Sequence, residues 1–164
     1  MSKLKNLEEK IFDLDRLKSG INVWRSQRKK IVFTNGCFDI IHLGHIDYLA
    51  KAADLGDKLI IGLNSDKSTR SIKGPSRPIT DERSRSLVLA SFSFVDAVVF
   101  FDDETPLELI KIVMPDVLVK GADYTIDQIV GSDTVIQNGG SVQTLDYIPG
   151  YSTTLIEQKI KALN

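Results

Sequence analysis

The segment TNGCFDIIHLGH, residues 34–45, contains both histidines of the chain, His42 and His45. On a helix, side chains three positions apart share one face, so the two imidazoles could reach the same anion. A glycine-bearing turn in front of a helix also presents unpaired backbone N–H groups and the positive end of the helix dipole, and both favour phosphate. Gly36 lets the backbone approach a ligand closely. Gly44 lowers helix stability by ~0.5–1 kcal/mol relative to alanine, which makes sense if a larger side chain would block a ligand there.

These residues are also compatible with roles other than phosphate binding. One histidine could cap the helix while the other packs in the core, which is the commoner situation for two arbitrary histidines. A metal site is disfavoured because the segment lacks the four-residue histidine spacing and the glutamate of the zinc-protease helix. Cys37 could act as a nucleophile at a helix start, but it fits better as a small apolar residue that packs in the turn. Neither G-x-G-x-x-G nor G-x-x-x-x-G-K-[ST] occurs, which excludes the usual dinucleotide fingerprint and the P-loop.

The elements around this turn alternate between short apolar runs and helical patterns. The runs that favour strands are residues 31–35, 58–64, 96–101, 116–120 and 142–146. Helical periodicity marks the stretch from Ile46 to Gly56 and a second one at about residues 81–92. This order predicts a single α/β domain: a doubly wound, Rossmann-like parallel sheet of about five strands, in which ligands bind at the carboxyl ends of the strands.

The ends of two further helices and the N-terminal segment are also expected from local signals. Thr105, Pro106 and Glu108 form a capping box with proline at the first helical position, and this helix stops before Met114-Pro115. The last helix begins near Ser152 and is expected to bury Ile156, Ile160 and Leu163. Residues 1–30 form an amphipathic helical extension, whose first helix Gly20 ends, packed on a domain of residues 31–164.

The composition limits the class of partner. A chain of 164 residues, 42% apolar and 26% charged, is long enough for one domain with a buried core. A net charge of −1 indicates neither nucleic acid nor an anionic membrane as partner. A single cysteine excludes an internal disulfide, and with two histidines it cannot complete a four-ligand zinc site. Without an apolar leader or a run of ~18 apolar residues, the protein is expected to be cytoplasmic.

The segment His42-Leu43-Gly44-His45, behind Asn35-Gly36-Cys37-Phe38-Asp39, resembles the H-x-G-H signature of the nucleotidyltransferase superfamily. Members of this superfamily move a nucleoside monophosphate from a triphosphate onto a phosphate or similar acceptor. Four further segments match it in order: Asn64-Ser65-Asp66; Lys73-Gly74 with Arg77-Pro78; Lys120-Gly121-Ala122-Asp123-Tyr124; and Ser152-Thr153-Thr154. Over residues 25–162 the set is most similar to the nucleotidyltransferase domain of the bacterial heptose-phosphate enzymes that make ADP-glycero-manno-heptose for lipopolysaccharide.

The resemblance implies a role for each matching residue. The acceptor phosphate attacks the α-phosphorus directly and pyrophosphate leaves, so positioning and charge stabilisation do the catalysis. His42, His45, Lys120 and Thr153 would be catalytic. The nucleotide would contact Thr34, Asn35, Gly36, Cys37, Phe38, Gly44, Gly121, Asp123, Ser152 and Thr154. The acceptor would contact Asp39, Asp66, Lys73, Arg77 and Arg85, the last three in a basic, mobile segment that closes over anions.

These matches predict an adenylyltransferase that joins ATP and D-glycero-D-manno-heptose 1-phosphate into ADP-heptose and pyrophosphate, with Mg²⁺ held through the nucleotide phosphates and no protein metal ligands. Two alternatives stay open: cytidylyl transfer from CTP to glycerol 3-phosphate or another alcohol or sugar phosphate, and a non-catalytic, nucleotide-binding regulatory subunit. Many superfamily members carry Arg or Lys shortly after the Ser/Thr-rich helix start, where this chain has Glu157 and Gln158, so one triphosphate contact is unassigned. The chain is too short for the kinase domain of the bifunctional relatives, so a separate sugar kinase is expected, and the relatives suggest a homodimer.

Overall fold

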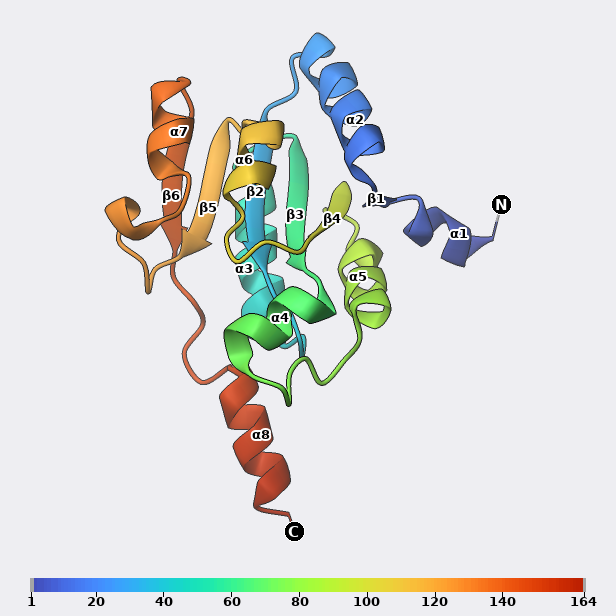
Figure 1. Ribbon diagram of the computed structural model, residues 1–164, viewed down its shortest axis with the longest axis vertical. Coiled ribbons are helices and arrows are strands. Elements are labelled where there is room, and N and C mark those ends of the chain that lie inside the picture. Colours follow the sequence, from blue (N-terminus) through green and yellow to red (C-terminus); the bar gives the residue numbers. More distant parts are fainter. Residues whose placement is uncertain (1, 164) are drawn as a thin grey trace.

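A computed structural model describes residues 2–163 and contains one six-stranded parallel sheet (Figure 1). Five strands are those expected from the sequence: β2 (Ile31–Gly36), β3 (Lys58–Asn64), β4 (Ala97–Phe101), β5 (Val117–Gly121) and β6 (Ser141–Leu145). The sixth is β1 (Ile11–Phe12), which corrects the expected count of about five. Two residues are too few for a strand periodicity to be visible in the sequence.

The strand order β1-β4-β3-β2-β5-β6 changes direction at β2. From β2 the chain adds β3 and β4 on one side, and it then returns to add β5 and β6 on the other side. In open parallel sheets, ligands bind beyond the carboxyl ends of the strands at such a switch point. Here the switch point lies between the carboxyl ends of β2 and β5, where the histidine segment follows β2.

Helices cover both faces of the sheet (Figure 1). They are α1 (Lys3–Glu8), α2 (Leu14–Ser26), α3 (Leu43–Ala53), α4 (Asp66–Lys73), α5 (Glu82–Ser91), α6 (Leu107–Val113), α7 (Ser132–Gln137) and α8 (Thr153–Lys161), with a short 3-10 turn, Ile126–Gln128. Helices α2, α6 and α7 share one buried cluster with the sheet, and α3 and α5 share the other. Phe33 belongs to the first cluster and its neighbour Val32 to the second, as expected for a strand buried on both faces.

Two expectations about helix ends are wrong. Gly20 lies inside α2 rather than at a helix end, because its neighbours Leu17 and Ile21 are buried in the core and this packing outweighs the weak helix propensity of glycine. The capping box of α6 is also absent, since Pro106 occupies the N-cap position and no side chain caps that helix. The other end of α6 agrees with the sequence, because Met114 terminates it in a left-handed conformation.

The N-terminal extension is part of the layered structure. β1 pairs with β4 through Ile11 and Val98, and α2 contributes Leu17 and Ile21 to one core cluster. β1 therefore adds an edge strand to the sheet.

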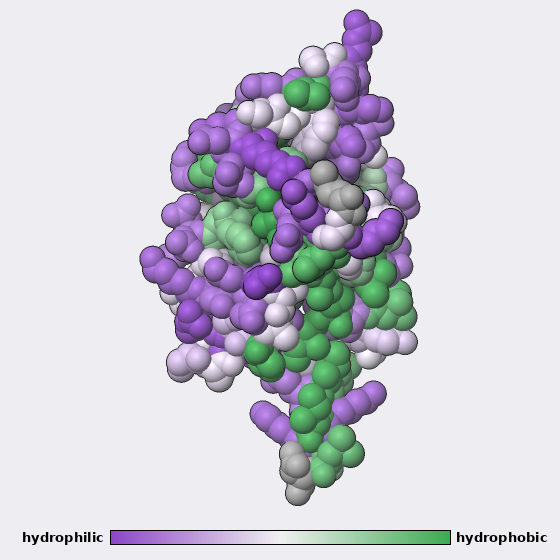
Figure 2. All heavy atoms as spheres, turned by 90° about the vertical axis from the view of Figure 1, so that its right-hand side faces the viewer, coloured by the Kyte–Doolittle hydropathy of each residue, from purple (hydrophilic) through white to green (hydrophobic). Residues whose placement is uncertain are grey.

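Helix α8 projects beyond the carboxyl ends of the strands (Figure 1). It starts as expected, with the Ser152 hydroxyl accepting a hydrogen bond from the N–H of Leu155. The expected burial of Ile156, Ile160 and Leu163 is wrong, because α8 has no buried residue, and Leu163 beyond it is 86% exposed. Figure 2 shows apolar side chains along this projecting end. Within residues 2–163, no helix is long and apolar enough to cross a bilayer.

Candidate active site

The turn after β2 brings the two histidines into contact. Phe38 adopts a left-handed backbone conformation with φ of 46°, and His42 is the N-cap residue of α3 rather than a residue of its first turn. A non-glycine residue in this conformation is strained, which is common where a turn positions functional groups. The imidazoles of His42 and His45 stack with ring centroids 3.9 Å apart, and the ring of Phe38 lies 5.5 Å from that of His45.

Both imidazoles have buried polar atoms without partners. Nδ1 of His42, Nδ1 of His45 and Oδ1 of Asn35 are buried and make no hydrogen bond within the described part of the chain. Burial lowers the pKa of His42. Burial, together with His42 and the ammonium of Lys73, lowers the pKa of His45 to about 4, against the opposing effect of the Ile40 backbone. His45 is therefore neutral at pH 7 and can still donate one N–H. Buried polar atoms without partners are rare, and a polar ligand would explain a cluster of them.

A cavity of about 420 Å³ opens beside the histidine turn, at the switch point of the sheet. Its volume is in the range of small-molecule binding sites. Nine of the residues predicted to bind substrate or catalyse line it: Asn35, Gly36, Cys37, Phe38, His45, Lys73, Lys120, Gly121 and Asp123. The structure thus brings together the turn after β2, the end of α4 and the end of β5, which are far apart in the sequence.

Lys120, near the end of β5, is a half-buried cation on the cavity wall. Its Nζ lies 3.5 Å from the backbone oxygen of Asn35 and 5.8 Å from the ring centroid of Tyr124. Burial lowers the pKa of Lys120 to about 8, against the opposing effect of the Asp123 carboxylate. A partly desolvated ammonium in a cavity is suited to contact a phosphate.

Two tyrosines missed by the sequence analysis complete this side of the cavity. Tyr147 packs directly on Gly121, so that a Cβ at position 121 would overlap its ring. The ring centroids of Tyr48 and Tyr147 are 5.5 Å apart, and the Tyr48 hydroxyl is 2.7 Å from Oγ1 of Thr34. Thr34 is therefore engaged inside the protein and does not line the cavity.

The start of α8 lies against the start of α3. A methyl group at Gly44 would lie 3.1 Å from both Cε1 and Nδ1 of His42 and 3.4 Å from Cβ of Tyr151. The segment Ser152-Thr153-Thr154 consequently begins next to the histidine turn, although these three residues and His42 itself do not line the cavity. The Ser152 hydroxyl caps its own helix, which leaves Thr153 and Thr154 to supply hydroxyl groups.

Of the residues expected to bind the acceptor, only Lys73 lines the cavity. Asp39 is buried and accepts hydrogen bonds from Nη1 of Arg77 at 2.8 Å, from the N–H of Ile79 at 2.8 Å and from the N–H of Thr80 at 2.9 Å. Burial raises the pKa of Asp39, but these hydrogen bonds outweigh that effect and hold the pKa below its usual value. Asp39 therefore ties the histidine turn to the segment before α5.

Arg77 is engaged in the same way, because it also forms an ion pair with Glu157 of α8. The three basic residues expected in one mobile segment instead lie in different structural elements. Lys73 is the last residue of α4, Arg77 is held between Asp39 and Glu157, and Arg85 lies buried in α5, where it forms an ion pair with Asp66.

The cavity wall also includes residues that no functional motif indicated. It contains Phe101 at the end of β4, Glu104 and Thr105 beyond that strand, Gln128 in the 3-10 turn and Val130 after it. Among the described residues, Glu104 makes no ion pair. The only sequence signal that could have placed Glu104 at the site is its position shortly after a strand that ends at this edge of the sheet.

Residues 33–159 match the family model described as cytidylyltransferase-like, a range that contains every site residue discussed above. The chain belongs to the cytidylyltransferase-like family. This membership confirms the resemblance to nucleotidyltransferases that the sequence motifs indicated, and the parallel α/β sheet agrees with it. The domain is a nucleotidyltransferase domain.

Individual members of the family show a more specific similarity. The chain is 49% identical over 152 residues to the bifunctional protein HldE of Methylobacillus flagellatus, covering 93% of this chain and 31% of that protein. It is 51% identical over 156 residues to the bifunctional protein HldE of Campylobacter jejuni subsp. doylei, covering 95% of this chain and 32% of that protein. The chain thus spans about a third of the length of these relatives.

Solved structures agree in fold. The lipopolysaccharide core biosynthesis protein from Thermoplasma volcanium is 30% identical, with a TM-score of 0.60 over 73% of this chain and 97% of that chain. The pantoate-beta-alanine ligase from Francisella tularensis is 16% identical, with a TM-score of 0.60 over 92% of this chain and 76% of that chain, and this likeness concerns the fold alone.

Proposed function

We propose that this chain transfers AMP from ATP to D-glycero-D-manno-heptose 1-phosphate, which yields ADP-heptose and pyrophosphate. Membership of the cytidylyltransferase-like family supports the reaction class. The similarity to HldE and to a lipopolysaccharide core biosynthesis protein supports a heptose phosphate as acceptor.

One observation carries the proposal. At the switch point of the sheet, His45 is neutral and its Nδ1 has no hydrogen-bond partner among residues 2–163. It shares a cavity with two cations, Lys73 and Lys120, which have no carboxylate within 4 Å in the same part of the chain. Phosphate oxygens would supply the missing acceptors for each of these groups. A non-catalytic binding subunit would not need an imidazole pair stacked over a strained turn.

In the proposed reaction, the acceptor phosphate attacks the α-phosphorus in line as the bond to pyrophosphate breaks. His45 donates a hydrogen bond to the phosphate oxygens that gain charge, and His42 orients that imidazole through the stacked contact. Lys120 contributes positive charge on the side of β5, and Thr153 donates its hydroxyl from the start of α8. These groups act by positioning and by electrostatic stabilisation, without a covalent intermediate.

Two sets of cavity-lining residues suit the two substrates. Gly121, Tyr124 and Tyr147 offer aromatic surface and a backbone without side chain, which suits the nucleoside. Lys73 offers an ammonium for the acceptor phosphate, and Glu104 offers a carboxylate that can accept hydrogen bonds from sugar hydroxyls.

Magnesium fits this site through the nucleotide rather than through a protein cage. Residues 2–163 contain no cluster of three or more side chains able to hold a metal ion, and two carboxylates, Asp123 and Glu104, line the cavity. Mg²⁺ commonly keeps several waters and binds phosphate oxygens, and it would neutralise charge on the triphosphate. The proposed setting is a cytoplasmic homodimer supplied with sugar 1-phosphate by a sugar kinase, and the apolar face of α8 supports self-association.

Pyrophosphate release tests the proposal. ATP, CTP, GTP and UTP are each combined with heptose 1-phosphate and with glycerol 3-phosphate, and ATP with the heptose phosphate is expected to be the fastest pair. His45→Ala should reduce kcat by ~10²-fold or more with little loss of fold, the scale of a lost transition-state donor. Preference for CTP and glycerol 3-phosphate would replace the assignment with cytidylyl transfer. Tight nucleotide binding with no turnover of any pair would indicate a regulatory subunit.

A further inference from the structure

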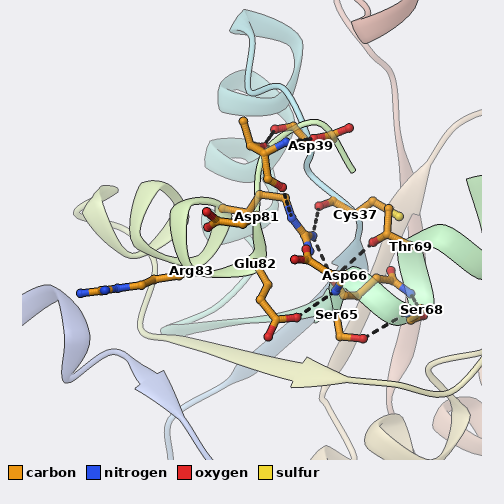
Figure 3. Close-up of polar contacts among 12 residues, drawn as sticks. Cys37, Asp39, Ser65, Asp66, Ser68, Thr69, Asp81, Glu82 and Arg83 are labelled. Atoms are coloured by element: carbon orange, nitrogen blue, oxygen red, sulfur yellow. Dashed lines mark hydrogen bonds and ion pairs between the residues drawn. The ribbon is translucent and has the colours of Figure 1, made fainter. Parts of the chain in front are cut away.

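Arg85 places a charged group in the protein interior, with a side chain that is 0% exposed. Its Nε donates to the carbonyl of Thr80 at 3.1 Å, and its Nη1 donates to the carbonyls of Cys37 at 2.6 Å and of Asn64 at 2.8 Å. Its Nη2 donates to the carboxylate of Asp66 at 2.8 Å. Figure 3 shows Cys37 and Asp66 converging on this group of contacts from different elements.

Two of these partners, Cys37 and Asn64, lie just beyond the last residues that pair strand β2 with strand β3. In the register of β2 and β3, Gly36 is paired with Leu63, and no pair follows. Cys37 directly follows β2 and Asn64 is the last residue of β3, and Nη1 of Arg85 bridges their carbonyls. The guanidinium therefore continues the connection between the two strands past the end of the backbone ladder.

The chemistry of these contacts is specific to arginine. A planar guanidinium carries five N–H donors in a fixed arrangement, whereas the single nitrogen of lysine cannot reach acceptors on three separate segments. A buried charge is unfavourable unless its donors are satisfied, and a packed apolar side chain could stabilise the fold as well or better. Fixing the relative positions of the three segments is the property that an apolar side chain would lack.

We propose that Arg85 is a positioning residue for the reaction: it holds the histidine turn and the end of β3 in register, and it touches neither substrate. This inference rests on the proposed nucleotidyl transfer, and it replaces the expectation that Arg85 binds the acceptor. Arg85 acts on the imidazole of His45 through two consecutive residues. It binds the carbonyl of Cys37, and the next residue, Phe38, has a strained backbone that places its ring against His45. Arg85 itself does not line the cavity.

The test compares Arg85→Lys with Arg83→Lys. Arg83 lies on the same helix with 77% of its side chain exposed, and its nearest carboxylate is that of Glu8 at 3.8 Å, so it is a matched control. The measurements are kcat, the KM for ATP, the KM for heptose 1-phosphate, and the titration of the imidazole signals by NMR. The chain has two histidines, so the spectrum is simple.

Arg85→Lys is expected to lower kcat by ~30-fold or more while the KM of the acceptor stays within ~3-fold, because displaced groups lose transition-state contacts. The titration midpoint of His45 should rise from about 4 towards 6.5 as the turn loosens. Arg83→Lys should leave every value unchanged. If Arg85→Lys does not fold, Asp66→Asn removes the carboxylate partner alone and should change kcat and the His45 titration in the same direction by a smaller factor.

Two results would overturn the inference. The first is a folded variant with a raised acceptor KM and unchanged kcat, which would return Arg85 to acceptor binding. The second is a folded variant with wild-type kinetics and a wild-type His45 titration. A wild-type protein inactive with every nucleotide and acceptor would instead refute the proposed function, and the imidazole titration would still decide whether Arg85 holds the turn.

Discussion

Replacing Gly44 with alanine should separate the stability of the protein from its activity. The new methyl group would lie 3.1 Å from Cε1 and Nδ1 of the His42 ring, whereas comfortable carbon contacts are ~3.5–4.0 Å. The imidazole must therefore move by roughly half an ångström. Close contact with His42 and with Tyr151 at the start of α8 is thus one reason for glycine at this position.

The expected magnitudes differ for the two properties. A misplacement of 1 Å in an active site can lower the rate by ~10²-fold, so a shift of half that size should lower kcat/KM by ~10-fold, or ~1.4 kcal/mol of transition-state stabilisation. Alanine in a helix stabilises by at most ~1 kcal/mol relative to glycine, and the crowding offsets part of this. For a chain of this size, the melting temperature should therefore change by no more than ~4 °C.

The assay measures pyrophosphate release and thermal unfolding of Gly44→Ala beside Gly20→Ala. Gly20 also lies within a helix, and its methyl group would meet Cε2 of Phe12 at 3.2 Å, far from any histidine in the sequence. This control should show a comparable change in stability with wild-type kcat/KM. A folded Gly44→Ala protein with wild-type kcat/KM would refute the argument that His42 must keep its position.

Two further predictions concern pH. Burial lowers the pKa of Lys120 to about 8, so kcat/KM should fall as the pH rises through about 8 and the ammonium loses its proton. Lys120→Arg should move this fall to higher pH. An unchanged pH profile in the variant would exclude Lys120 as the origin of the fall. The folded-state pKa of His45, about 4, lies below its ordinary value of 6.5. Between these two pH values the unfolded chain therefore binds more protons than the folded protein. The free energy of unfolding should consequently decrease as the pH falls from about 6.5 to about 4. Urea unfolding at several pH values should show a weaker dependence for His45→Gln than for the wild type, and parallel curves would contradict this explanation.

Local sequence signals predicted the strands well because each strand is buried on both faces. β3 matches the expected range, and β2, β5 and β6 are shifted or extended by one residue. β1 has two residues, and α4 follows β3 without an apolar stripe, since it contains buried Ser68 and Thr69 rather than large apolar residues. Neither element carries the periodicity from which an assignment could be made.

The candidate site was predicted where a motif and a strand end coincide. The cavity is lined by residues from the histidine turn, by Lys73 and by the segment after β5. Glu104 and Tyr147 were missed because each belongs to a connecting segment whose place depends on the packing of the whole sheet. The exposed apolar side chains of α8 were expected to be buried, because periodicity predicts an apolar face but not the surface that covers it.

The sequence by itself determined the alternation of strands and helices and the place of the histidine turn, because periodicity, glycine positions and histidine spacing are properties of neighbouring residues. Only the tertiary structure decided which charged side chains are available to a ligand. Asp39 pairs with Arg77, 38 positions away, and Arg85 bonds to Cys37, 48 positions away, while Lys73 and Lys120 face the cavity. The sequence alone does not distinguish the charged residues of this set, and they differ because long-range packing supplies internal charged partners to Asp39, Arg77 and Arg85 but, within the described residues, not to Lys73 and Lys120.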